Sequence, residues 1–160
     1  MFALLHWLQY NPLTTTINET GWMYAAAEIT HYFSLFILVG TIVLIDLRLL
    51  GVAARSQGTV QLAEQLSTWT WIALVLAILS GAVMFSTNAT AFFPDTVFRV
   101  KMLVISIALI FTVVVHRGIY KQDGSLQIST GLKLAALGSL VFWIGAILAG
   151  VEIAAISGLG

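Results

Sequence analysis

One long apolar stretch decides the fold: residues 22–49 read WMYAAAEITHYFSLFILVGTIVLIDLRL. A helix crosses a hydrocarbon layer of ~30 Å with about 20 residues, at a rise of about 1.5 Å per residue, so this stretch is long enough to span a membrane. Three more apolar stretches follow, at residues 66–87, 98–119 and 132–156. Their apolar residues run continuously instead of alternating, which excludes a β-barrel. The sequence predicts an all-α integral membrane protein.

Composition supports the same class of protein. The chain has 160 residues, of which 59% are hydrophobic and 9% charged, and its mean hydropathy is +0.99. A water-soluble domain has roughly a quarter of its residues charged. Seven basic residues balance seven acidic ones, so the net charge indicates no nucleic-acid partner. There is no cysteine, which excludes disulfides, thiolate catalysis and iron–sulfur clusters.

The breaks between the apolar stretches are short and polar, at residues 51–65, 88–97 and 121–130. Short connections favour neighbouring antiparallel helices, so we expect an up-down four-helix bundle that forms one domain over residues 1–160. No catalytic triad, phosphate-binding loop or zinc signature is present. We therefore assign no catalytic residue, and whether the chain is an enzyme stays open.

Residues 1–21 are too short and too polar to form a fifth span. A helix here would bring Phe2, Leu5 and Leu8 close together, so we expect an interfacial helix on the outer leaflet that ends at Asn11-Pro12. No basic segment of the kind found in cleaved signal peptides precedes the apolar residues.

Basic residues near the helix ends predict the orientation. One side carries five of them, Arg48, Arg55, Arg117, Lys121 and Lys133, and the other side carries Arg99 and Lys101. The more basic side of a membrane protein faces the cytoplasm. We expect a multi-pass protein of the bacterial inner membrane with both termini on the periplasmic side.

Ionisable residues at membrane depth form a first layer near the outer surface. Each is a functional candidate, because an ionisable group in lipid is energetically expensive. Glu28 and His31 lie one helical turn apart and share a face of the first span. Lys101 begins the third span, which runs in the same direction, so we expect it at the depth of Glu28.

The fourth stretch adds Glu152 to this outer layer. Glu152 follows Gly145 and Gly138 at seven-residue intervals on one stripe of the helix. A glycine stripe marks the side on which another helix approaches closely, so Glu152 should point into protein. We also expect three thioethers at nearly this depth, those of Met23, Met84 and Met102.

A second, inner polar cluster consists of Asp46, Arg48, His116 and Arg117. Asp46 lies eighteen residues after Glu28, about five helical turns, and so projects from the same face. We expect Asp46 and Arg48 to form an ion pair at the cytoplasmic end, with a gate or proton path as the alternative, and His116 to be an interfacial residue. His31 and His116 should lie near opposite membrane surfaces, so one iron cannot bind both within one chain.

Three interpretations of the outer layer stay open. Haem b could be held by neutral His31, with Met84, Met102 or no protein ligand opposite and with Lys101 paired to Glu28, Glu152 or a propionate. Copper could be held by His31 and the methionines, because thioethers suit soft metals. Glu28 and Glu152 are further candidate metal ligands beside His31. The third interpretation needs no cofactor: the cluster fixes the register of the helices.

Several segments resemble a family of small bacterial inner-membrane proteins that is known only as a domain of unknown function. They are GWMYAAAEITH (21–31), LVGTIVLIDLRLLG (38–51), VFRVKM (97–102) and VHR (115–117). The resemblance implies that six positions match the family's recurring polar residues: Glu28, His31, Asp46, Arg48, Lys101 and His116. Members carry Arg-Trp late in the fourth helix, where this chain has Val151-Glu152. The four-helix plan is also distantly similar to the copper resistance protein D and membrane cytochrome b groups.

Three hypotheses of function follow. The first is a small membrane redox or haem-binding subunit with Glu28, His31 and Lys101 in the functional cluster. The second is copper or proton handling around His31. The third is an accessory subunit of a homo-oligomer or larger membrane complex, motivated by the glycine stripe. Trp143, in the middle of the fourth span, is expected to pack in the core or to stack on a ring.

Overall fold

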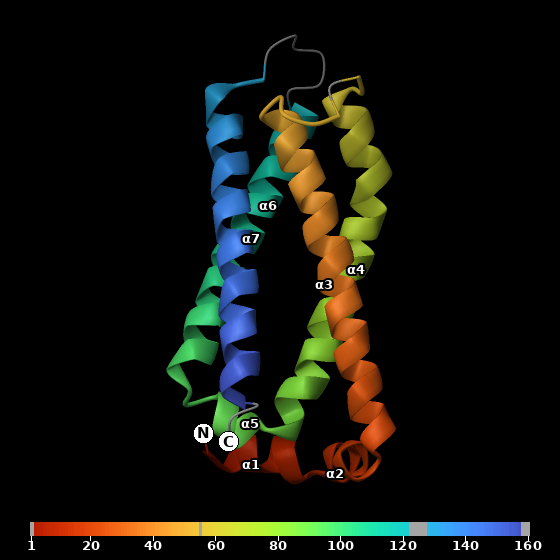
Figure 1. Cartoon of the computed structure of the whole chain (residues 1–160), viewed down its shortest axis with the longest axis vertical. Coiled ribbons are helices and arrows are strands. Elements are labelled where there is room, and N and C mark those ends of the chain that lie inside the picture. Colours follow the sequence, from red (N-terminus) through yellow and green to blue (C-terminus); the bar gives the residue numbers. More distant parts are fainter. Residues whose placement is uncertain (1, 55, 122–127, 158–160) are drawn as a thin grey trace. The chain divides into compact units, whose positions relative to one another are not determined.

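The computed structural model describes residues 2–54, 56–121 and 128–157, with side chains described as far as Ala149. Four long helices dominate: α3 (Gly21–Leu49), α4 (Thr59–Thr87), α6 (Thr96–Lys121) and α7 (Thr130–Ser157) (Figure 1). Three short helices complete the described part: α1 (Phe2–Tyr10), α2 (Pro12–Glu19) and α5 (Ala89–Phe92). The predicted all-α class is confirmed for these residues.

The four long helices are long and apolar enough to cross a membrane. At most 33% of the most apolar part of each is buried inside the chain, and large apolar side chains such as Phe33, Phe36 and Leu148 are exposed. A water-soluble monomer rarely exposes apolar surface on this scale. These observations support the prediction of a multi-pass protein in a lipid bilayer.

All four long helices extend beyond the boundaries predicted from hydropathy, and the starts of α4 and α6 show why. Helix α4 begins at Thr59, seven residues before the expected start of the span, because Leu62 and Ala63 are buried and continue the packed face of the helix. Helix α6 begins at Thr96, where the Asp95 carboxylate accepts the Phe98 N–H at 2.8 Å and caps the helix. The apolar stretch marks only the part of each helix that suits lipid.

The N-terminal segment contains two helices instead of one. Helix α1 ends at Tyr10, as predicted, and α2 starts directly afterwards. The Asn11 side chain accepts the Thr14 N–H at 3.0 Å, and Pro12 occupies the first helical position, where its missing N–H costs nothing. Helix α1 packs against α5, where the Gln9 side-chain oxygen accepts the Thr90 N–H at 2.9 Å and the Thr90 hydroxyl at 2.6 Å.

The chain folds into two compact units. Unit 1 comprises Met1–Leu38 and Trp69–Arg99, and unit 2 comprises Val39–Thr68 and Val100–Gly160. In unit 2, parts of α3, α4, α6 and α7 share one hydrophobic core. The buried residues of this core are Ile45, Leu49, Ala63, Val115, Ile119, Leu132, Ala135 and Ala136.

The glycine stripe of α7 packs against α6 within unit 2. A Cβ at Gly138 would lie 2.8 Å from Cε1 of Phe111, and a Cβ at Gly145 would lie 3.7 Å from Val104. The Phe111 ring also stacks on Phe142, with centroids 5.5 Å apart. The predicted close approach to this stripe is therefore made by α6 of the same chain, and the accessory-subunit hypothesis stays a prediction.

Candidate functional site

The imidazole of His31 is held against α4 within unit 1. Its Nδ1 lies 3.0 Å from the carbonyl oxygen of Ala77 and 3.1 Å from the hydroxyl of Ser80. The Ser80 hydroxyl donates its own proton to the Leu76 carbonyl at 2.6 Å, so it faces His31 as an acceptor. A carbonyl oxygen can only accept, so Nδ1 of the neutral ring carries the proton and Nε2 carries the lone pair.

Gly81 makes room for this ring. A Cβ at Gly81 would lie 3.0 Å from Cε1 and 3.4 Å from Nδ1 of His31, closer than side chains normally pack. The glycine thus lets the imidazole reach the α4 backbone. Gly81 was not predicted from the sequence. The small residues Ala77, Ser80 and Gly81 indicate room on this face of α4, but not which side chain fills it.

The remaining residues of the predicted outer layer are divided between the two units. In unit 1, Glu28 lies one turn before His31 on α3 and Met84 lies one turn after Gly81 on α4, and both are half-buried. Lys101, half-buried, and Met102, 46% exposed, belong to unit 2. Their association with His31 stays a prediction. The side chain of Glu152 lies outside the described side chains.

Carboxylates and imidazoles do not gather around His31 in the number that a closed metal site needs. Among the described residues, no three His, Asp or Glu side chains are placed to hold one metal ion. A metal bound at His31 would therefore need a further ligand. This could be a thioether, the carboxylate of Glu152, or a cofactor that brings its own ligands. Haem meets this condition, because its porphyrin supplies four nitrogen ligands and the protein adds only the axial ones.

A second polar site lies in unit 2, between α3 and α7. Asp46 is 1% exposed and Ser139 is fully buried. The Ser139 hydroxyl interacts with the Asp46 carboxyl. Even so, Oδ2 of Asp46 and Oγ of Ser139 have no well-formed hydrogen bond to any described residue. Two buried oxygens are thus left next to each other without satisfied hydrogen bonding, which is uncommon in folded proteins.

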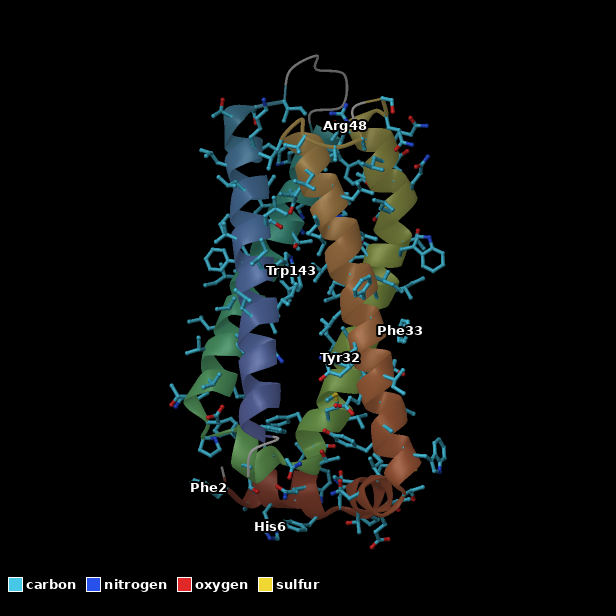
Figure 2. The ribbon with its side chains drawn as sticks, in the orientation of Figure 1. Phe2, His6, Tyr32, Phe33, Arg48 and Trp143 are labelled. Atoms are coloured by element: carbon cyan, nitrogen blue, oxygen red, sulfur yellow. The ribbon has the colours of Figure 1, made fainter. Side chains whose placement is uncertain are left out.

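Arg48 does not neutralise Asp46. Its Nε donates to the carbonyl of Gln57 at 2.8 Å, in the turn that follows α3 (Figure 2). Within the described part of the chain, the predicted ion pair between Asp46 and Arg48 is not formed, so that prediction was wrong. The physical reason is that residues two apart on a helix do not face each other.

His116 is buried, whereas its neighbour Arg117 is exposed. His116 therefore lies on the inner face of α6, and its expected position at the membrane interface stays a prediction. Val115 beside His116, Ile45 beside Asp46 and Ala136 one turn before Ser139 belong to the same contiguous core. This core places His116, Asp46 and Ser139 in one part of unit 2.

Trp143 extends this polar layer along α7. Its ring is 2% exposed and lies halfway along the helix (Figure 2), and its Nε1–H donates to Oγ1 of Thr112 at 3.0 Å. The Thr112 hydroxyl in turn donates to the Ala108 carbonyl at 3.0 Å. Of the two roles predicted for Trp143, packing in the core is the one that these contacts support.

Comparison with known proteins places the chain in a family without assigning it a reaction. A family model, described as Family of unknown function (DUF6644), matches residues 4–155, a range that includes every candidate residue named above. No curated protein and no solved structure matches the chain. The chain therefore belongs to the DUF6644 family of unknown function.

Proposed function

We propose that this chain is a small integral membrane redox subunit that binds haem b through His31. The observation that carries the proposal is the bond from Nδ1–H of His31 to the Ala77 carbonyl. A histidine that ligates a metal almost always donates its other ring N–H to a carbonyl or carboxylate, which fixes the tautomer and aims the ring. Here that bond keeps the lone pair on Nε2, the nitrogen that would bind iron.

The surroundings of His31 fit an axial ligand of haem. The ring is held from one side by Ala77 and Ser80 and rests against Gly81, so its orientation is fixed before any cofactor binds. Met84 would be the second protein ligand, with His31 as the sole protein ligand as the alternative. When bound, haem would supply one-electron transfer.

The proposal includes a membrane topology. We propose an up-down order of the four long helices in the bacterial inner membrane, with both termini on the periplasmic side. Helix α1 would lie on the outer leaflet, supported by its exposed apolar side chains, among them Leu4, Trp7 and Phe2, the last labelled in Figure 2. In this order Glu28 and Met84 lie on the same, periplasmic side of the contact between His31 and Gly81.

Titration of the purified full-length protein with haem tests the proposal. We expect saturable binding at one haem per chain, and its loss in His31→Ala. The matched controls are His116→Ala, which removes the buried imidazole of unit 2, and His6→Ala, which removes an exposed one; both should still bind. Binding that is equally strong in His31→Ala would refute the assignment of the ligand.

Copper binding is a second candidate, favoured by the half-buried thioether of Met84 one turn from Gly81. An imidazole and a thioether suit Cu(I). The four-helix plan is also distantly similar to the copper resistance protein D and membrane cytochrome b groups, and we include this architectural similarity only as part of the proposal. Elemental analysis separates the two candidates: copper that co-purifies with the wild type and is lost in both His31→Ala and Met84→Leu would favour copper over haem.

A further inference from the structure

Asp46 carries a carboxyl group that its surroundings cannot stabilise as an anion. It is buried in unit 2 among the apolar side chains of the shared core, beside Ile45 and close to Leu49. An ionised carboxylate in an apolar interior is strongly unfavourable unless a cation or several hydrogen-bond donors accompany it. Among the described residues, the Ser139 hydroxyl is the one donor found beside this carboxyl, and Oδ2 still has no well-formed hydrogen bond.

The charged groups of the surrounding helices do not supply the missing cation. On α3, Arg48 donates to Gln57. On α6 and α7, Arg117, Lys121 and Lys133 are exposed and Lys101 is half-buried, and on α4 Glu64 is exposed. His116 on α6 is the ionisable neighbour that is buried in the same core. No ion pair involving Asp46 is formed within the described residues.

The number of ligand atoms decides what neutralises the carboxyl. A hard metal cation such as Na⁺ or Ca²⁺ needs about six oxygen ligands, and the side chains here offer the carboxyl of Asp46 and the hydroxyl of Ser139. A proton needs one carboxyl oxygen to bind and one acceptor to bond to. The pair can supply both, since a hydroxyl oxygen can accept as well as donate and Oγ of Ser139 has no other hydrogen bond to a described residue.

We propose that Asp46 and Ser139 form a proton-binding site inside the membrane-spanning part of the protein. Asp46 holds the proton as a neutral carboxylic acid and donates it in a hydrogen bond to Oγ of Ser139. Asp46 and Ser139 belong to unit 2, whereas His31, Ala77, Ser80 and Gly81 belong to unit 1, so this site shares no residue with the proposed haem site. Loss or gain of the proton changes the charge of the buried core by one unit.

Infrared spectroscopy of the full-length protein in lipid at neutral pH tests this site. We expect a C=O stretching band of a protonated carboxylic acid that shifts to lower frequency in D2O. The band should be lost in Asp46→Asn, which keeps the shape of the side chain, and kept in Glu64→Gln, which removes an exposed carboxylate on α4. In Ser139→Ala the band should stay but shift, because the acceptor is gone.

Several outcomes of the infrared experiment would contradict the proposal. A wild-type spectrum without such a band, or a band that persists in Asp46→Asn, overturns the proposal. A band that disappears on addition of NaCl in the wild type would overturn it in favour of a metal-cation site. If Asp46→Asn does not fold, the spectrum of Ser139→Ala tests the proposal instead. A band at the same frequency in Ser139→Ala as in the wild type would show that the acid does not bond to Ser139. We expect haem binding to be unchanged in all of these variants, so the test of Asp46 and the test of His31 can fail independently.

Discussion

Replacing Gly81 with alanine should push the imidazole of His31 off the α4 backbone. The new Cβ would lie 3.0 Å from Cε1, whereas carbon atoms pack best at about 3.5–4.0 Å. The ring must therefore retreat by roughly 0.5–1 Å. The bond from Nδ1 to the Ala77 carbonyl, now 3.0 Å, would reach or exceed ~3.5 Å, at which it no longer counts as a hydrogen bond.

The free energy of unfolding should fall by about 1–3 kcal/mol in Gly81→Ala. Overpacking costs ~1–3 kcal/mol and the weakened hydrogen bond about 1 kcal/mol. The higher helix propensity of alanine offsets up to ~1 kcal/mol. Because the bond orients the ring, we also expect haem affinity to fall about 10-fold to 100-fold.

A double-mutant cycle in detergent, read by circular dichroism during unfolding, isolates this contact. With His31→Ala in place there is no ring to displace, so Gly81→Ala should then be neutral or stabilising by up to ~1 kcal/mol. Gly40→Ala is the matched control, because nothing lies within 4 Å of a Cβ at that helical glycine. Equal destabilisation by Gly81→Ala in both backgrounds, or no difference from Gly40→Ala, would refute the geometry.

Two further predictions concern the packing of α6 and α7. Gly138→Ala places a Cβ 2.8 Å from the Phe111 ring and should lower the free energy of unfolding by about 1–3 kcal/mol. The control Gly131→Ala, with open space around the new Cβ, should not lower it. Equal effects of the two substitutions in the same unfolding assay would speak against the close packing. Thr112→Val removes the acceptor of the buried Trp143 N–H and should cost about 1–3 kcal/mol, with a changed tryptophan fluorescence spectrum; an unchanged spectrum and stability would contradict the hydrogen bond.

The membrane character of the fold could be predicted from the sequence because it depends on length and hydropathy alone. Helix ends could not, because they depend on packing and caps: Leu62 and Ala63 extend α4, and Asp95 starts α6. The glycine stripe correctly indicated a close approach to α7. Which helix approaches was not readable from the stripe itself, and the structure identifies it as α6.

The polar sites were predicted only as sets of residues. Their order along each helix could be counted from the sequence, and their depth in the membrane stays a prediction. The direction of each side chain could not be predicted, because it depends on the neighbouring segments. Arg48 points to Gln57, and His116 faces the core. Gly81 carried no signal of its own, because its role exists only relative to the ring of another helix.

The optical spectrum of the purified full-length protein, expressed with a haem precursor and recorded before and after dithionite, tests the proposed function most directly. We expect a Soret band that shifts on reduction, is absent from His31→Ala and is retained in His116→Ala. A wild-type spectrum without a Soret band, or a band that survives unchanged in His31→Ala, would contradict the assignment of His31 as the ligand of haem.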